Sequence, residues 1–142
     1  MYRLWNAVKS FFSGSGDDDI DIVRMIKGDD EELIAAVAKA RATVDEFIDH
    51  FHNPEMEGAA FFVKQEFVEG EQSEHMWLMV DEVTETHFSG VVNNDPQFVT
   101  QVRIGERIKV AHEEIGDWMV SHGDDMTGGF TVEVLMRRGQ KT

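Results

Sequence analysis

Apolar residues recur every three or four positions between residues 30 and 52. The spacing is that of one face of an α-helix. The series comprises Leu33, Val37, Ala40, Val44, Phe47 and Phe51. Asp29 precedes it, with Glu32 three residues later, a combination typical of a helix N-terminus, and Asn53-Pro54 marks its end. The pattern therefore predicts one long helix, about Asp30 to His52, that packs this face against the rest of the domain.

From Ala60 the apolar pattern changes to a period of two, which is typical of strands. Strands are expected at about residues 60–67, 74–83, 85–92 and 115–120, with short strands on either side of Gly105 between Val102 and Val110. Residues 69–72 predict a hairpin loop, and residues 122–125 a second loop.

One helix followed by consecutive strands, without β–α–β alternation, indicates an α+β fold with an antiparallel sheet. We expect a long N-terminal helix packed on a curved antiparallel sheet of about five strands. At the C-terminal end, Thr131 could cap a short helix over residues 131–138. A terminal strand is the alternative, because Thr131, Val132 and Val134 are β-branched; the helix is favoured narrowly.

The first 28 residues differ from the rest of the chain. Residues 1–12 form an amphipathic pattern, and a Ser-Gly stretch followed by Asp17 to Asp19 predicts a flexible acidic linker. We therefore divide the chain into an N-terminal peptide and linker, residues 1–28, and a single α+β domain, residues 29–142. Packing on its own domain, or a frayed end, is favoured for residues 1–12 over contact with a membrane.

Composition narrows the function classes. The chain has 142 residues, no cysteine, 28 acidic and 13 basic residues, and a net charge of −15. Such charge repels nucleic-acid backbones and suits a basic protein partner, although solvation alone also explains it. Without cysteine there is no disulfide or thiolate metal site. No apolar run approaches the roughly 20 residues of a membrane span, and we expect a cytoplasmic protein.

The most chemically suggestive residues are Glu74, His75 and Asp117. A carboxylate beside a histidine can tune a general base. In a strand, however, Glu74 and His75 point to opposite faces. A structural role is favoured, in which Trp77 and Trp118 fill the core and their polar neighbours satisfy hydrogen bonds.

A second candidate region is the amide-rich turn at Asn93-Asn94. It could line a cleft with Trp77 and Trp118, although an Asx-turn between two strands is favoured. The candidate binding residues are thus Lys64, Glu74, His75, Asn93, Asn94 and Asp117. No cofactor motif and no tetrahedral metal-ligand set can be recognised, so neither a cofactor nor a metal is expected.

Several motifs in the body of the chain form a joint pattern. They are Ala36, Ala40, Arg41, Thr43 and Phe47 in the helix; Val63-Lys64; Glu74 to Trp77; Phe88, Gly90, Asn93 and Pro96; Ile115, Asp117, Trp118 and Met119; and Gly128 to Thr131. In these motifs the chain resembles the YegJ-like family of uncharacterised bacterial proteins, a domain of unknown function. The resemblance implies a fold and a bacterial origin, and it implies no established activity or catalytic residue.

Two functional hypotheses follow. The favoured one is a non-catalytic binding or protein-interaction domain in bacteria that sequesters or inhibits a partner protein. The alternative is a small hydrolase-like enzyme that uses His75 or Asp117. The binding hypothesis is favoured because the sequence contains no complete set of nucleophile and base. Convergence of Lys64, Glu74, His75, Asn93 and Asp117 in one pocket would favour the enzyme.

Overall fold

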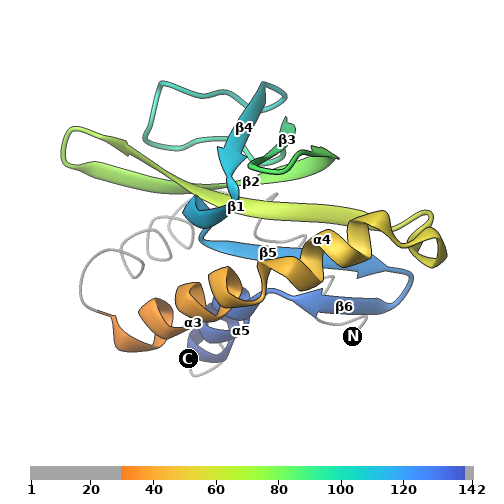
Figure 1. Ribbon diagram of the computed structural model, residues 1–142. Coiled ribbons are helices and arrows are strands. Elements are labelled where there is room, and N and C mark those ends of the chain that lie inside the picture. Colours follow the sequence, from red (N-terminus) through yellow and green to blue (C-terminus); the bar gives the residue numbers. More distant parts are fainter. Residues whose placement is uncertain (1–29, 140–142) are drawn as a thin grey trace.

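The structure, a computed structural model, describes residues 30–139. They form one antiparallel sheet with the strand order β4-β3-β2-β1-β5-β6, covered by helices α3, α4 and α5 (Figure 1). The strands are β1 Ala60–Glu69, β2 Gln72–Val83, β3 His87–Val92, β4 Arg107–Ala111, β5 Asp117–His122 and β6 Asp125–Gly128. The α+β class is confirmed, whereas the expected count of about five strands is one too few. The expectations for residues 1–28, and for Asp29 as a helix cap, lie outside the described residues.

The predicted long helix is two helices, α3 Glu31–Ala42 and α4 Val44–His52. Asp30 caps α3 by accepting a hydrogen bond from the Leu33 backbone N–H at 3.2 Å. The break falls at Thr43, whose hydroxyl donates to the Lys39 carbonyl at 2.8 Å and accepts from the indole Nε1 of Trp118 at 3.1 Å. A threonine bonded back to the preceding turn bends a helix, and the indole fixes that bend. Short 3₁₀ turns follow at Pro54–Met56 and His112–Glu114.

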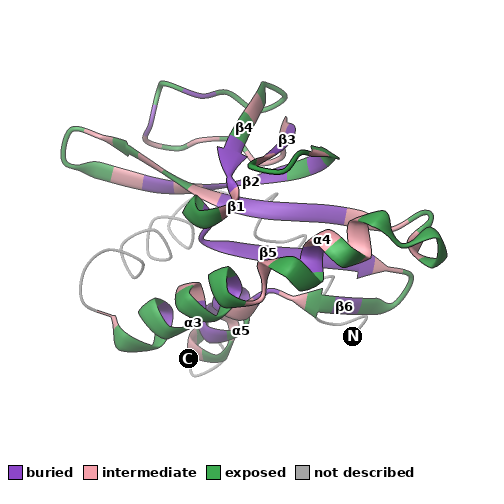
Figure 2. Ribbon diagram, viewed as in Figure 1, coloured by how far each residue is buried: buried purple, intermediate pink, exposed green. Residues whose placement is uncertain are grey.

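The two helices consequently differ in their main packing partners, although Ala40 near the end of α3 belongs to the same core cluster as Phe47. Phe47 of α4 is fully buried and meets Phe61, Phe88 and Trp118 in edge-on or tilted ring contacts on one face of the sheet. The apolar face of α3 instead packs on α5, Phe130–Gly139, with Leu33 and Ala36 against Val134 and Leu135. The prediction that Leu33 packs on the sheet is therefore wrong. Figure 2 shows β1 and β5 as mostly buried beside α4, whereas the outer sides of α3 and α4 are mostly exposed.

Helix α5 begins where β6 ends, beside the first residues of β5. Gly128 and Gly129 have positive φ angles of 81° and 70°, and a Cβ at Gly128 would overlap Trp118. The Gly-Gly pair thus lets the chain turn tightly against the tryptophan. The helical expectation for residues 131–138 is confirmed.

One strand prediction and one loop prediction need correction. Residues 101–106 are a loop, with Gly105 at a φ of 86°, so a strand follows Gly105 but none precedes it. Val102 is buried in a small core cluster under that loop. Its apolar side chain therefore reflects burial and not pairing with a neighbouring strand. The expected loop at residues 122–125 is a tight turn into β6.

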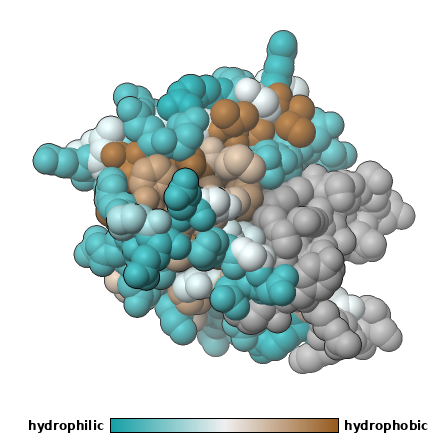
Figure 3. Space-filling model, turned by 90° about the vertical axis from the view of Figure 1, so that its right-hand side faces the viewer, coloured by the Kyte–Doolittle hydropathy of each residue, from teal (hydrophilic) through white to brown (hydrophobic). Residues whose placement is uncertain are grey.

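The chain is strongly acidic, with 28 acidic and 13 basic residues. Most of its described charged residues lie at the surface, and Lys64, Glu74 and Asp117 are buried. On the face drawn in Figure 3, most coloured side chains are hydrophilic, and the hydrophobic ones gather mainly in the upper half. None of the described helices is long and apolar enough to cross a membrane.

Candidate functional site

A row of buried polar groups crosses three strands on the sheet face opposite α4. Lys64 of β1 lies between Trp77 of β2 and Asp117 of β5, because both are its cross-strand partners. The ammonium of Lys64 is 5.6 Å from the centre of a Trp77 ring and donates to the Thr131 hydroxyl at 2.5 Å. All four side chains are buried. A buried lysine normally requires such partners.

Asp117 serves as the N-terminal cap of α5, from a different segment of the chain. One carboxylate oxygen accepts from the backbone N–H groups of Trp118 and Phe130, at 2.8 and 3.1 Å. The other accepts from the backbone N–H and the hydroxyl of Thr131, at 2.9 and 2.6 Å. These bonds satisfy N–H groups that a helix start leaves without partners. The cap expected from Thr131 is thus supplied by Asp117.

Burial shifts the pKa values of both charged groups in this row. It lowers the pKa of Lys64 to about 8, while the nearby carboxylates of Asp117 and Glu66 act in the opposite direction. Burial likewise raises the pKa of Asp117, against the effects of Lys64 and of the Thr131 hydrogen bonds. The Thr131 hydroxyl joins the two groups, so the row links the centre of the sheet to the start of α5.

His75 lies on the same face, one row further along the β1–β2 hairpin, opposite Glu66. Its side chain is 11% exposed, and among the described residues neither ring nitrogen has a hydrogen-bond partner; Nε2 is 3.8 Å from a Glu66 carboxylate oxygen. Burial, together with the positive charge of Lys64, lowers its pKa to about 3. The imidazole is therefore neutral at physiological pH and a weak base. It forms no hydrogen bond with Asp117, so the two residues of the hydrolase hypothesis do not act as a pair.

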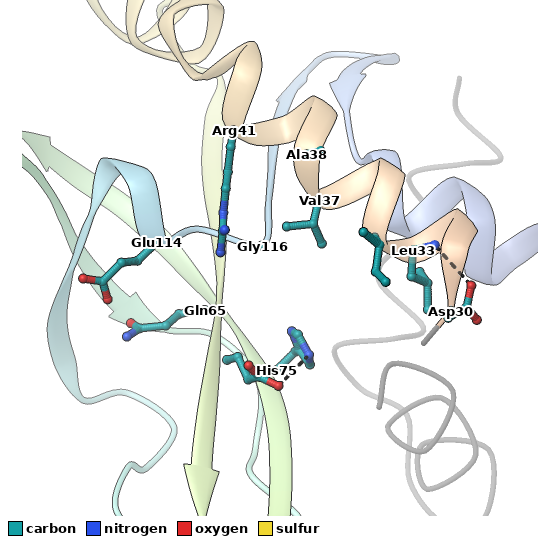
Figure 4. A pocket seen from close by; sticks show the side chains of 11 residues that line it. Asp30, Leu33, Val37, Ala38, Arg41, Gln65, His75, Glu114 and Gly116 are labelled. Carbon is teal, nitrogen blue, oxygen red and sulfur yellow. Dashed lines mark hydrogen bonds and ion pairs between the residues drawn. The ribbon is translucent and has the colours of Figure 1, made fainter. Parts of the chain in front are cut away.

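A pocket of about 630 Å³ opens beside His75, between α3 and the hairpin (Figure 4). Leu33, Ile34, Val37 and Ala38 of α3 form its apolar side, and the other lining residues are Asp30, Arg41, Gln65, Glu66, His75, Glu114 and Gly116. In Figure 4, Arg41 reaches from α3 towards Gly116. Its Nε donates to the Ile115 carbonyl at 2.8 Å. The volume lies within the range of ligand-binding sites.

The remaining candidate residues lie elsewhere and have structural roles. Glu74 faces the opposite side of the sheet from His75, as expected, and accepts from the backbone N–H groups of Gln97, Phe98 and Val99 at 2.6, 2.9 and 3.1 Å. It thereby anchors the loop between β3 and β4.

Asn93 and Asn94 extend the pairing along β2. The Asn93 N–H donates to the Trp77 carbonyl at 2.8 Å, and the Trp77 N–H donates to the Asn94 side chain at 2.7 Å. They form no cleft with the two tryptophans, because Trp77 and Trp118 lie on opposite faces of the sheet. Of the predicted residues, Lys64, His75 and Asp117 share one face, and His75 alone lines the pocket.

Sequence reasoning missed Arg41, Gln65 and Thr131 as members of these sites. The Gln65 side-chain oxygen is buried beside the pocket and has no hydrogen-bond partner in the described part of the chain. Arg41 belongs to the helical motif that includes Ala40. That motif predicted a helix, and nothing in it indicated that Arg41 would line a pocket. Within residues 30–139, no group of three or more His, Asp or Glu side chains is arranged to hold a metal.

Comparison with known proteins assigns the chain to a family. The family described as "Uncharacterized protein conserved in bacteria (DUF2314)" matches residues 30–141. The chain is 32% identical over 127 residues to the "Uncharacterized protein YegJ" of Escherichia coli K12. The matched stretch covers 89% of this chain and 82% of that protein.

A further similarity is partial. Over 78 residues, 55% of this chain, it is 37% identical to a putative ankyrin repeat protein of Neisseria meningitidis serogroup B, and the match spans 30% of that protein. No solved structure matches. Because the family match covers the whole described domain, the chain belongs to the DUF2314 family of uncharacterized bacterial proteins.

Proposed function

We propose that the chain is a non-catalytic protein-interaction domain of the bacterial cytoplasm, with its binding site in the pocket between α3 and β1. The observation that carries this proposal is the lining of the pocket. An apolar helix face lies opposite polar side chain atoms that form no hydrogen bond with any residue from 30 to 139, namely both nitrogens of His75 and the oxygen of Gln65. Buried polar groups without partners are uncommon in folded proteins. The three atoms are themselves shielded from solvent, so a ligand would supply their partners once the His75 and Gln65 side chains turn towards the pocket.

The polar row supports a structural assignment for the other charged groups. Asp117 already accepts four hydrogen bonds, and Lys64 is committed to Thr131. A nucleophile or base needs a free, accessible lone pair at a suitable pKa. Neither the capped carboxylate nor a histidine with a pKa of about 3 meets that need. Non-catalytic binding therefore accounts for the site with fewer additional requirements than hydrolysis.

The ankyrin-repeat relative is consistent with an interaction role. Ankyrin-type repeats stack into extended binding surfaces, and a segment similar to this chain occupies part of a protein with that description. A domain that adds a second binding site would suit such a setting.

Site-directed photo-crosslinking in the bacterial host tests the proposal. A benzophenone amino acid would replace Ala38, which is exposed at the pocket, and in a matched control Asp49, which is exposed on α4. We expect a discrete protein adduct from position 38 and not from position 49, and its loss when Val37→Asp is added. The absence of any adduct specific to position 38 would contradict the proposed function.

A further inference from the structure

Part of β1 has an open edge at the pocket. β1 pairs with β2 over Phe62–Glu69 but with β5 only over Ala60–Lys64. In Figure 1 the β1–β2 hairpin extends beyond the start of β5. Among the described residues, no strand therefore lies alongside residues 65–69 on the β5 side. An open strand edge is a template for pairing with another chain.

The direction of the backbone groups identifies the free position. The Lys64 carbonyl accepts from the Gly116 N–H at 2.7 Å, and the Val68 carbonyl accepts from the Gln101 side chain at 2.9 Å. In an antiparallel sheet, alternate residues direct their N–H and C=O groups to the same edge. Glu66 lies midway between these two residues, so both of its backbone groups point to the open edge. No hydrogen bond to them is formed by residues 30–139.

The lining beside this edge combines apolar and acidic character. Ile34 is 57% exposed next to Leu33 and Val37. The charged lining residues include the carboxylates of Glu66 and Glu114 and the guanidinium of Arg41, whose Nε donates to the Ile115 carbonyl. The Glu66 carboxylate accepts a hydrogen bond from the Ser73 hydroxyl at 2.5 Å. Asp30 does not contribute free charge, because Arg138 holds it in a two-pronged ion pair and lowers its pKa to about 2. The pocket thus offers apolar contacts and a local excess of negative charge.

We propose that this pocket binds an extended segment of a partner protein that adds as a strand to β1 at Glu66. This inference rests on the proposed function and specifies the ligand. Backbone pairing with Glu66 would supply affinity, as in other strand-addition complexes. An apolar side chain of the segment would pack on Val37 and Ile34, and a neighbouring lysine or arginine would pair with Glu66 or Glu114. The partner segment would therefore alternate apolar residues with lysine or arginine.

Fluorescence anisotropy with defined peptides and the full-length chain tests this assignment. The probe is a labelled peptide of alternating valine and lysine. Two comparison peptides replace lysine with glutamate, or carry N-methylated backbone amides that keep the side chains but cannot pair with a strand edge. We expect binding of the first peptide and roughly tenfold or greater weakening for each comparison peptide.

Protein variants distinguish the pocket from general attraction to an acidic protein. Val37→Asp should weaken binding roughly tenfold, and Ala38→Arg serves the same purpose if the first variant does not fold. Glu66→Lys with Glu114→Lys should reverse the preference towards the glutamate peptide. The surface variant Asp49→Asn should bind like the wild type.

Three results would overturn the proposal. The first is the absence of binding, and the second is binding that is indifferent to N-methylation and to Val37→Asp. The third is displacement of the probe by a peptide of residues 1–12, or a change to a dimer on dilution-sensitive sizing, which would assign the pocket to this chain or to a second copy. A partner that crosslinks at position 38, together with no binding of the peptide, would support the proposed protein-interaction function. It would contradict the addition of a strand to β1.

Discussion

The Lys64 ammonium and the Asp117 carboxylate share the hydroxyl of Thr131, which lies 2.5 Å from the first and 2.6 Å from the second. The three groups are buried on the sheet face opposite α4, where α5 begins. A carboxylate that caps a helix and also offsets a buried cation has two stabilising roles in one side chain.

Asp117→Asn should therefore lower the free energy of unfolding by about 3–5 kcal/mol, the range for breaking a buried charged pair. An amide has one acceptor oxygen and a donor NH2 group in place of the second oxygen, so it can serve only two of the four donors, and it leaves the Lys64 charge without compensation. Urea denaturation at neutral pH would measure the loss, with the exposed variant Asp49→Asn as the control. A loss no larger than that of the control would show that the row contributes little to stability.

The break between α3 and α4 depends on Thr43 and Trp118. Thr43→Val removes the acceptor of the buried indole N–H, and an unsatisfied buried donor costs about 1–3 kcal/mol. Thr43→Ser keeps the hydroxyl and should retain most of the stability. Chemical denaturation would compare the two variants, and equal losses would assign the effect to side-chain packing at this position.

Anchoring of the β3–β4 loop depends on Glu74. Glu74→Gln should weaken three charge-assisted bonds and destabilise the protein by about 1.5–3 kcal/mol. Amide hydrogen exchange should accelerate at Gln97, Phe98 and Val99 before it does in β1. Glu69→Gln, which affects the exposed contacts to Thr100, is the matched comparison and should have a smaller effect. Unchanged exchange at these three amides would contradict the anchoring role.

His75 should make the fold sensitive to acid. Its pKa is about 3 when folded and about 6.5 when unfolded. Between these values the unfolded chain binds more protons, so stability falls as the pH decreases through that window. The contribution at pH 5 relative to pH 7.5 is about 2 kcal/mol, from roughly 1.4 kcal/mol per pH unit.

Denaturation of wild type and His75→Phe at these two pH values would measure this contribution. The wild type should lose more stability than the variant on acidification. Parallel losses in both proteins would show that His75 is not the responsible group.

The sequence predicted the features that depend on local pattern. The hairpin at Gly70-Glu71, the period-two strands and the terminal helix follow from turn chemistry and alternation. The helix break does not, because Thr43 is compatible with a continuous helix until Trp118, 75 positions away, donates to it. Strand β6 is four residues long, too short for a periodic signal.

The pocket was beyond local reasoning for a similar reason. Its lining combines α3 with β1, β2 and the segment before β5, which lie far apart in sequence. Arg41 and Gln65 carry no signal of their own that connects them to His75. By contrast, the opposite orientation of Glu74 and His75 was predictable, since it follows from strand geometry alone.

The strand order has a consequence for how the chain reaches this structure. β1 to β4 are neighbours in sequence as well as in the sheet, and β5 with β6 forms a separate hairpin. The junction of β1 with β5 joins residues 60–64 to residues 117–121, so it closes the longest loop of the five strand pairings and has the largest single entropic cost of closure. Folding should therefore proceed through two locally formed units, the four strands β1 to β4 and the β5–β6 hairpin. Their docking along β1 should be the slow step. Lys64, Asp117 and Thr131 meet at that junction. Their contacts should therefore form only when the two units dock, and they should stabilise the docked state.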